Sequence, residues 1–254
     1  MKLDENIAAI VTGGAAGLGG ATAQMLADAG AKVAIFDLNE ETGSAHAAAI
    51  GGAFFTVNVA DDESVADGIA AAEAAHGTAR VLVNCAGVAP AIRTVGKENA
   101  PHPLDAFRKT IEVNLIGTFN VVSKFAALLA VADPIGEERG VIVNTASVAA
   151  YDGQIGQAAY ASSKGGVVGM TLPVARDLAQ HKIRVLTIAP GIFFTPMLKG
   201  LPQAAQDSLG LQVPHPSRLG KPEEYAQLVS AIIANPMLNG ETIRLDGAIR
   251  MAPR

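Results

Sequence analysis

Near the N-terminus a glycine-rich run joins an apolar segment to a helix-forming one, and no other motif restricts the fold as much. Residues 6–11 read N-I-A-A-I-V, residues 12–20 read T-G-G-A-A-G-L-G-G, and residues 21–29 favour a helix that ends before Gly30. Such a loop lets the main chain approach a pyrophosphate, and the helix N-terminus offers free N–H groups. The unit therefore predicts a dinucleotide site; the alternative is a flexible turn.

The rest of the chain repeats this alternation of strand and helix. Short runs rich in Val and Ile predict parallel strands at 6–11, 32–36, 53–57, 80–83, 141–146, 183–188 and 241–245. The stretches between them predict helices at 21–29, 40–50, 62–76, 104–130, from Tyr160 to about Gln180, and at 223–234. We predict an α/β fold with one doubly wound Rossmann domain over residues 1–254, a seven-stranded parallel sheet and helices on both faces.

Composition narrows the possible functions. The formal net charge is −5, and Lys and Arg are scattered singly, so we expect no nucleic-acid partner and no membrane partner. We identify no apolar run that reaches the roughly 20 residues of a membrane span. The start, M-K-L-D-E-N, is unlike a signal peptide, and the single cysteine suits a reducing compartment, so we expect a cytoplasmic protein.

Neither cysteine nor histidine chemistry is predicted. No Cys/His cluster has metal-ligand spacing, so we expect no metal site. Cys85 is interpreted as a small inert residue rather than a nucleophile. The five histidines are dispersed and are interpreted as surface residues: His46, His76, His102, His181 and His215.

Asp37 predicts which dinucleotide binds. It ends the second predicted strand, 18 positions beyond Gly19, close to the spacing at which an acid binds the adenosine ribose. Its carboxylate would repel a 2′-phosphate, and no Lys or Arg lies in residues 13–20 or directly after Asp37. The sequence therefore favours NAD over NADP. Asp37 as the N-cap of the following helix is a second, compatible interpretation.

The candidate catalytic residues lie between Ser147 and Lys164. Ser147 follows a predicted strand, at the edge where open α/β sheets bind ligands. Tyr160 and Lys164 are four residues apart, so a helix places them on one face. An ammonium beside the phenol would lower the pKa of Tyr160 from about 10, which makes Tyr160 a candidate proton donor or acceptor. The alternative is a surface pair of little consequence.

Other segments are expected at the same edge of the sheet. Asn58 and Val59 follow the third strand, where an adenine ring can rest, and the small residues at 84–87 let a cofactor lie against the main chain. Asn114 interrupts an apolar helix and is either functional or a buried amide bonded to nearby backbone. Residues 192–217, punctuated by prolines, are predicted to form a substrate lid.

Taken together, these motifs resemble the short-chain dehydrogenase/reductase family over nearly the whole chain: residues 12–19, N-C-A-G at 84–87, Asn114, Ser147, Y-A-S-S-K at 160–164 and P-G at 190–191. Residues 113–121, 144–160, 216–220 and 239–251 are most similar to members that act on 3-hydroxyacyl-CoA. The resemblance implies an NAD-dependent oxidoreductase that interconverts straight or 2-methyl-branched 3-hydroxyacyl-CoA and 3-oxoacyl-CoA. It also implies a homotetramer with a role in fatty acid metabolism and branched-chain amino acid degradation.

The resemblance assigns roles to individual residues. Tyr160 is the implied general acid/base, Ser147 the donor to the substrate oxygen, and Lys164 the partner of the phenolate and the nicotinamide ribose. Asn114 would hold a water that links Lys164 to solvent, and Gln154 would line the acyl pocket. The implied NAD-binding residues are Gly13, Ala16, Gly17, Leu18, Gly19, Asp37, Asn58, Val59, Cys85, Ala86, Gly87, Tyr160, Lys164, Pro190, Gly191, Phe193 and Thr195.

Two residues depart from the family pattern. Asn58 stands where the family often has Asp; its side-chain oxygen can still accept a hydrogen bond from the adenine amine. Phe194 stands where glycine is expected, and its ring would reshape the lid or the acyl pocket.

Three alternatives share these motifs. A 3-oxoacyl-carrier-protein reductase usually needs NADPH and a basic patch, which Asp37 and the acidic net charge disfavour. A dehydrogenase of another secondary alcohol, such as a hydroxysteroid or a sugar, fits the same catalytic residues. A non-catalytic dinucleotide-binding scaffold is disfavoured because Ser147, Tyr160 and Lys164 are all present.

Overall fold

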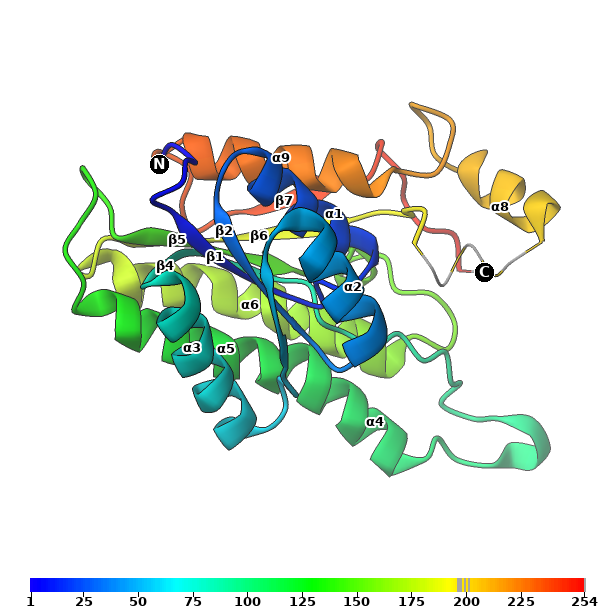
Figure 1. The fold of residues 1–254 in the computed structure, drawn as a ribbon. Coiled ribbons are helices and arrows are strands. Elements are labelled where there is room, and N and C mark those ends of the chain that lie inside the picture. The colour runs from blue at the N-terminus through cyan, green and yellow to red at the C-terminus, as the bar shows by residue number, and fades with distance from the viewer. Residues whose placement is uncertain (196–197, 199, 201, 254) are drawn as a thin grey trace.

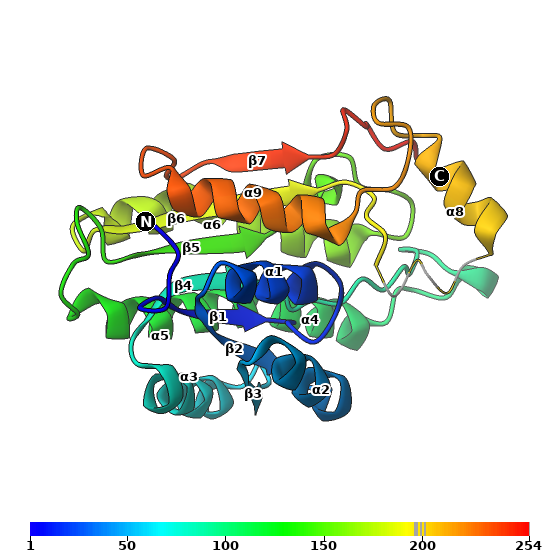
Figure 2. The same cartoon turned by 45° about the horizontal axis from the view of Figure 1, so that its top comes forward.

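The structure is a computed structural model and describes residues 1–195, 198, 200 and 202–253. Over these residues, seven parallel strands form one sheet between two layers of helices, in the order β3-β2-β1-β4-β5-β6-β7 (Figures 1 and 2). The strands are β1 (Ala8–Thr12), β2 (Lys32–Asp37), β3 (Ala53–Thr56), β4 (Ala79–Asn84), β5 (Gly140–Thr145), β6 (Ile183–Pro190) and β7 (Thr242–Leu245). The predicted fold class is confirmed.

Each face of the sheet has its own apolar core. On one face lie α1 (Gly17–Asp28), α2 (Glu40–Ile50) and α9 (Pro222–Ala234), and on the other lie α3 (Asp62–His76), α5 (Gly117–Ala130) and α6 (Ala158–Ala179). Successive strand residues point to opposite faces, so Val11 and Ile35 enter the first core while Ile10 and Phe36 enter the second. Because both faces are covered, the strands read as continuous apolar runs.

Helix caps settle one of the sequence interpretations. Helices α2 and α3 begin and end where predicted, and Asn39 and Asp61 cap them by accepting hydrogen bonds from Thr42 N and Ser64 N. Asn39, not Asp37, therefore caps α2. The interpretation of Asp37 as this cap is wrong.

The predicted helix at 104–130 contains a π-helical turn. It consists of α4 (Leu104–Ile111), the turn Glu112–Ile116 and α5. The span Leu104–Ala130 has a mean hydropathy of 1.5 in its most apolar window. By length and composition alone, this helix could cross a membrane, so the expectation that no such segment exists is corrected. Core helices pass the same test, and α5 buries Val121 and Phe125 against the sheet.

Several segments gather at the carboxyl ends of the strands, on the right in Figure 1: the loop at 89–103, the helix α8 (Gln203–Gly210) and the chain after β7. Helix α8 lies inside the predicted lid at 192–217 and was not foreseen. Residues 196, 197, 199 and 201 of that lid lie outside the described residues. The lid and the single-domain boundary both stay predictions.

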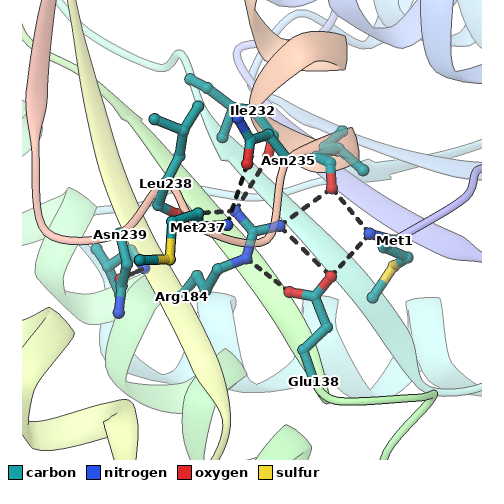
Figure 3. A network of polar contacts seen from close by, with 10 residues as sticks. Met1, Glu138, Arg184, Ile232, Asn235, Met237, Leu238 and Asn239 are labelled. Atoms are coloured by element: carbon teal, nitrogen blue, oxygen red, sulfur yellow. Dashed lines mark hydrogen bonds and ion pairs between the residues drawn. The ribbon is translucent and has the colours of Figure 1, made fainter.

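At the opposite ends of β5 and β6, a buried ion pair joins Glu138 to Arg184 (Figure 3). Arg184 Nε lies 2.7 Å from Glu138 Oε2, and the other guanidinium nitrogens donate to three main-chain carbonyls, those of Ile232, Ile233 and Leu238. The ammonium of Met1 donates to Glu138 Oε1 at 2.8 Å. The network fastens the end of α9 to the sheet.

Candidate active site

The candidate site lies at the topological switch point of the sheet. The chain leaves β1 toward β2 and β3, and β4 lies on the other side of β1, so the carboxyl ends of β1 and β4 flank a crevice. A cavity of 570 Å³ opens there. The predicted site residues among its lining are Gly13, Ala16, Leu18, Gly19, Cys85, Gly87, Ser147, Gln154, Tyr160, Lys164, Pro190, Gly191, Phe193 and Thr195.

The glycine loop has the close main-chain approaches that a dinucleotide site needs. Gly13 has φ +63°, and a Cβ on it would lie 2.7 Å from Ala86 N. A Cβ on Gly19 would lie 2.2 Å from Gly13 O. Helix α1 begins at Gly17 without a side-chain cap, so its first N–H groups face the loop unbonded by a capping side chain. The loop and helix end therefore fit the phosphates of a dinucleotide.

Asp37 lies at the end of β2, behind this loop. Its Oδ2 accepts from Ala15 N and its Oδ1 from Asn39 N, each at 3.1 Å. The Asp37 carboxylate thus holds the main chain of the glycine loop in place through Ala15 N. Gly17 lines a second cavity of 440 Å³ beside the first, together with Ala15.

Asn58, Val59, Ala86 and Asn114 are not among the residues that line the catalytic cavity. Asn58 Oδ1 accepts from Ala60 N at 3.2 Å, and Val59 is buried. Ala86 N donates to Thr12 Oγ1 at 3.2 Å. The cofactor roles of these residues, like that of Asp37, stay predictions.

Ser147, Tyr160 and Lys164 meet in the cavity although they come from two elements. Ser147 follows β5, and its Oγ accepts from Ala149 N at 3.1 Å, which leaves its O–H free to donate to Tyr160. Lys164 lies one turn beyond Tyr160 on α6, with Nζ 5.9 Å from the centroid of the Tyr160 ring. Nζ donates to the main-chain oxygen of Thr145 at 2.7 Å.

The pKa values of this group differ from the sequence prediction. Burial raises the pKa of Tyr160, and only the hydrogen bond with Ser147 opposes this rise. Burial also lowers the pKa of Lys164 to about 8. The prediction that Lys164 lowers the pKa of Tyr160 is therefore wrong for this structure, because Nζ is turned to Thr145 and Ser147 is the group that favours the phenolate.

Asn114 lies in the π-helical turn and is fully buried. Its Oδ1 accepts from Val88 N at 2.8 Å, while Nδ2 donates to Val88 O and to Ser163 Oγ, both at 2.9 Å. Ser163 Oγ in turn donates to Tyr160 O at 2.7 Å. The side chain acts as the buried amide of the second interpretation and ties the loop after β4 to α6. Its water-holding role stays a prediction.

Thr145 is a site residue that the sequence analysis missed. Its carbonyl anchors Lys164, and its hydroxyl donates to Asn84 O at 2.6 Å and lies 2.7 Å from Tyr225 Oη. Cys85 Sγ is 3.5 Å from the same hydroxyl, and burial raises its thiol pKa, in keeping with an inert residue. The place of Thr145 at the end of β5, two residues before Ser147, is the signal that would have found it.

The cavity also brings together segments that the sequence did not connect. Gln154 lines it as predicted, but its Nε2 donates to Ala252 O at 2.9 Å. Leu198, Leu209 and Met251 also line it and were not foreseen. Phe194 is 39% exposed and lines two neighbouring cavities instead.

Four of the five histidines differ from the surface interpretation, because His46, His76, His102 and His181 are half-buried and only His215 is exposed. His46 is half-buried, with Nδ1 3.0 Å from Gly14 O, and His102 has Nδ1 3.2 Å from Ile92 O. Among the residues that the structure describes, no group of three or more His, Cys, Asp or Glu side chains is placed to hold a metal ion.

Most of the chain is similar to known proteins. A family model described as short chain dehydrogenase matches residues 7–206. The chain belongs to this family and is an oxidoreductase that uses a nicotinamide dinucleotide and a small-molecule substrate.

Within this family, the chain is similar to several proteins that share one name. The chain is 52% identical to 3-hydroxyacyl-CoA dehydrogenase type-2 of Rattus norvegicus, covering 98% of this chain and 97% of the relative. It is equally identical, with the same coverage, to the Homo sapiens protein of that name. A crystal structure of 3-hydroxyacyl-CoA dehydrogenase type-2 from Mycobacterium avium matches with a TM-score of 0.94 at 43% identity, covering 100% of both chains.

Proposed function

We propose that the protein is an NAD-dependent dehydrogenase that interconverts 3-hydroxyacyl-CoA, straight or 2-methyl-branched, and 3-oxoacyl-CoA. The observation that carries this proposal is the meeting of Ser147, Tyr160 and Lys164 in one cavity with the glycine loop. Two relatives that match 98% of the chain are named 3-hydroxyacyl-CoA dehydrogenase type-2, which supports an acyl-CoA substrate. The remaining lining includes Leu198, Leu209 and Met251, which suits a substrate with a carbon chain.

The chain's own residues move the proton. Tyr160, as phenolate, takes the proton of the substrate hydroxyl during oxidation and returns it during reduction. In this structure the single hydroxyl proton of Ser147 is donated to Tyr160, which favours the phenolate. With substrate bound, Ser147 would donate that proton to the substrate oxygen instead and stabilise the negative charge that develops there. Lys164, whose Nζ donates to Thr145 O in this structure, would bind the nicotinamide ribose. NAD would supply the hydride acceptor, and the glycine loop and α1 would hold its phosphates.

The choice of NAD rests on Asp37. Its carboxylate lies at the end of β2 and is fixed by the N–H groups of Ala15 and Asn39. A 2′-phosphate near this carboxylate would meet like charge, and residues 13–20 contain no Lys or Arg to offset it. NADP should therefore bind much more weakly than NAD.

We also propose a cytoplasmic homotetramer without nucleic-acid or membrane partners, in which residues 192–217 serve as a substrate lid. Exposed apolar side chains on the helical layer support association: Ile116 at the end of the π-helical turn, Phe119 on α5 and Leu172 on α6. Acidic net charge supports the lack of nucleic-acid binding.

The test is an NAD-reduction assay followed at the nicotinamide absorbance. Substrates are 3-hydroxybutyryl-CoA, its 2-methyl analogue, the same acyl group on acyl carrier protein, and a hydroxysteroid, each with NAD and with NADP. We expect the highest kcat/KM for a CoA thioester with NAD. A preference for the carrier-protein substrate with NADP would contradict both the substrate class and the role of Asp37.

A further inference from the structure

The chain after β7 forms part of the catalytic cavity. Residues 246–253 lie at the carboxyl end of the sheet, and Met251 is one of the side chains that line the cavity. Leu198 and Leu209 of the 192–217 segment line it as well. None of these three apolar residues has a role in the proton transfer or in the predicted cofactor contacts, so their part in the site is open.

The C-terminal segment is fastened to the loop that follows Ser147. Gln154 Nε2 donates to Ala252 O at 2.9 Å, and Ile155 N donates to Pro253 O at 3.1 Å. These two hydrogen bonds join positions 98 residues apart in the chain. Gln154 therefore contacts the C-terminal segment directly through one of its two amide N–H groups.

Arg244 fixes the start of the same segment through ion pairs and a hydrogen bond. Arg244 Nε lies 2.7 Å from Asp246 Oδ2, and its Nη2 lies 2.6 Å from Asp152 Oδ2 and 3.0 Å from Ile249 O. Asp152 precedes Gln154 by two residues, so the loop and the segment are joined at two points. Residues 246–253 are thus held in place by these contacts, and with Met251 they form one wall of the cavity.

The chemistry of this wall suits a hydrocarbon chain. Ser147, Tyr160 and Lys164 form the polar part of the cavity, while Leu198, Leu209 and Met251 offer apolar surface. A methionine side chain is unbranched and adapts to chains of different shape. Removing one methylene's worth of contact in such a pocket changes kcat/KM about 10- to 200-fold.

We propose that Met251 is a specificity-determining residue that contacts the acyl chain of the substrate, and that Gln154 is a positioning residue that holds the Met251 wall in place. This inference rests on the proposed function, since it takes the substrate to be an acyl thioester. It assigns the C-terminal segment to substrate selection rather than to folding alone.

The test compares wild type, Met251→Ala and Met251→Phe on 3-hydroxyacyl-CoAs of increasing chain length and on a 2-methyl-branched one. Met251→Ala should change the long-to-short ratio of kcat/KM at least about tenfold, and Met251→Phe should change it in the opposite direction. The matched control is Met237→Ala, because Met237 is 90% exposed and remote from the cavity. Its ratio should equal that of wild type.

The outcomes separate the two levels of the proposal. If wild type oxidises no 3-hydroxyacyl-CoA, the proposed function fails. If wild type oxidises the series and both Met251 variants, folded by circular dichroism, keep its ratio, this inference fails while the function stands. If one variant does not fold, the other decides alone.

Gln154→Leu tests how the wall is held. It should raise hydrogen exchange at the Ile155 amide, which donates to Pro253, and shift the chain-length ratio in the same direction as Met251→Ala. Altered kinetics with unchanged protection of that amide would show that Gln154 acts on the substrate directly, which overturns its positioning role.

Discussion

Buried polar groups lie at both ends of strands β5 and β6, and their hydrogen-bond partners differ between the two ends. At the amino ends, the Glu138 carboxylate, Arg184 and the Met1 ammonium satisfy one another and three main-chain carbonyls (Figure 3). At the carboxyl end of β5, Lys164 has a main-chain carbonyl rather than a carboxylate as its acceptor, and burial lowers its pKa to about 8.

The difference separates a structural from a functional use of burial. In the first group the charges are paired, so the hydrogen bonds from Arg184 and the Met1 ammonium outweigh burial and lower the pKa of Glu138. In the second group burial outweighs the interactions that oppose it, so the pKa of Tyr160 stays raised and that of Lys164 stays lowered. Groups poised in this way inside a cavity are typical of catalytic sites. Changes at one end should therefore alter stability, and changes at the other should alter rate.

The largest expected effect is at the carboxyl end. Tyr160→Phe removes the hydroxyl that carries the proton, so turnover should fall by about 10² to 10⁴. The free energy of unfolding should change little, because one hydrogen bond contributes about 1 kcal/mol. Steady-state kinetics and urea unfolding of the same preparation measure both. Retained turnover would remove Tyr160 from the mechanism.

At the amino end the pattern should reverse. Glu138→Leu leaves Arg184 buried without its partner, so the free energy of unfolding should fall by about 3–5 kcal/mol, with kcat unchanged at low temperature. The double variant Glu138→Leu, Arg184→Met is the control and should recover much of the loss. A drop in kcat without a loss of stability would refute the division between the two ends.

The ion pair also predicts a pH dependence of stability. Because the pKa of Glu138 is lower in the folded protein, its stabilisation is complete above the unfolded carboxyl pKa of about 4.3 and is lost as pH falls through the folded value. Urea unfolding of wild type and Glu138→Leu should therefore converge in strong acid. A constant difference at every pH would show that Glu138 stabilises the fold without its charge.

Ser147 offers a smaller and sharper test of the carboxyl end. Its hydrogen bond opposes the burial that raises the pKa of Tyr160, so Ser147→Ala should raise that pKa further and leave less phenolate at any given pH. The pH midpoint of alcohol oxidation should move upward. Ser147→Thr, which keeps a hydroxyl, is the control. A midpoint that does not move would exclude Ser147 from tuning Tyr160.

The smallest effect is expected at an exposed ion pair. Arg218 and Glu224 form a bidentate pair on the surface, with distances of 2.6 and 2.9 Å, and this pair lowers the pKa of Glu224 to about 2. Water screens such a pair, so Arg218→Ala should leave the melting temperature close to that of wild type. A loss as large as that of Glu138→Leu would show that burial is not what distinguishes the Glu138 pair.

Local patterns in the sequence predicted much of this structure. The apolar runs predicted every strand because both faces of the sheet are covered, and the glycine loop predicted the crevice because Gly13 and Gly19 leave no space for Cβ atoms. Ser147, Tyr160 and Lys164 were found because strand ends and helix spacing place them. Their meeting is a direct consequence of the topology.

The parts that were missed depend on contacts between distant segments. The direction of the Tyr160 pKa shift depends on burial, and the acceptor of Lys164 is a main-chain atom, so no side-chain pattern reveals either. The bond from Gln154 to Ala252 spans most of the C-terminal half of the chain. Periodicity also cannot distinguish a π-helical turn from the α-helix around it.

That turn, Glu112–Ile116, makes the number of residues in this helix matter as much as their identity. Each residue of an α-helix advances the side chains by about 100°, so deleting one residue here would rotate everything before it relative to α5. Asn114 would then point away from Val88 and Ser163. Insertions and deletions in this stretch should therefore be far less tolerated than conservative substitutions of the same residues.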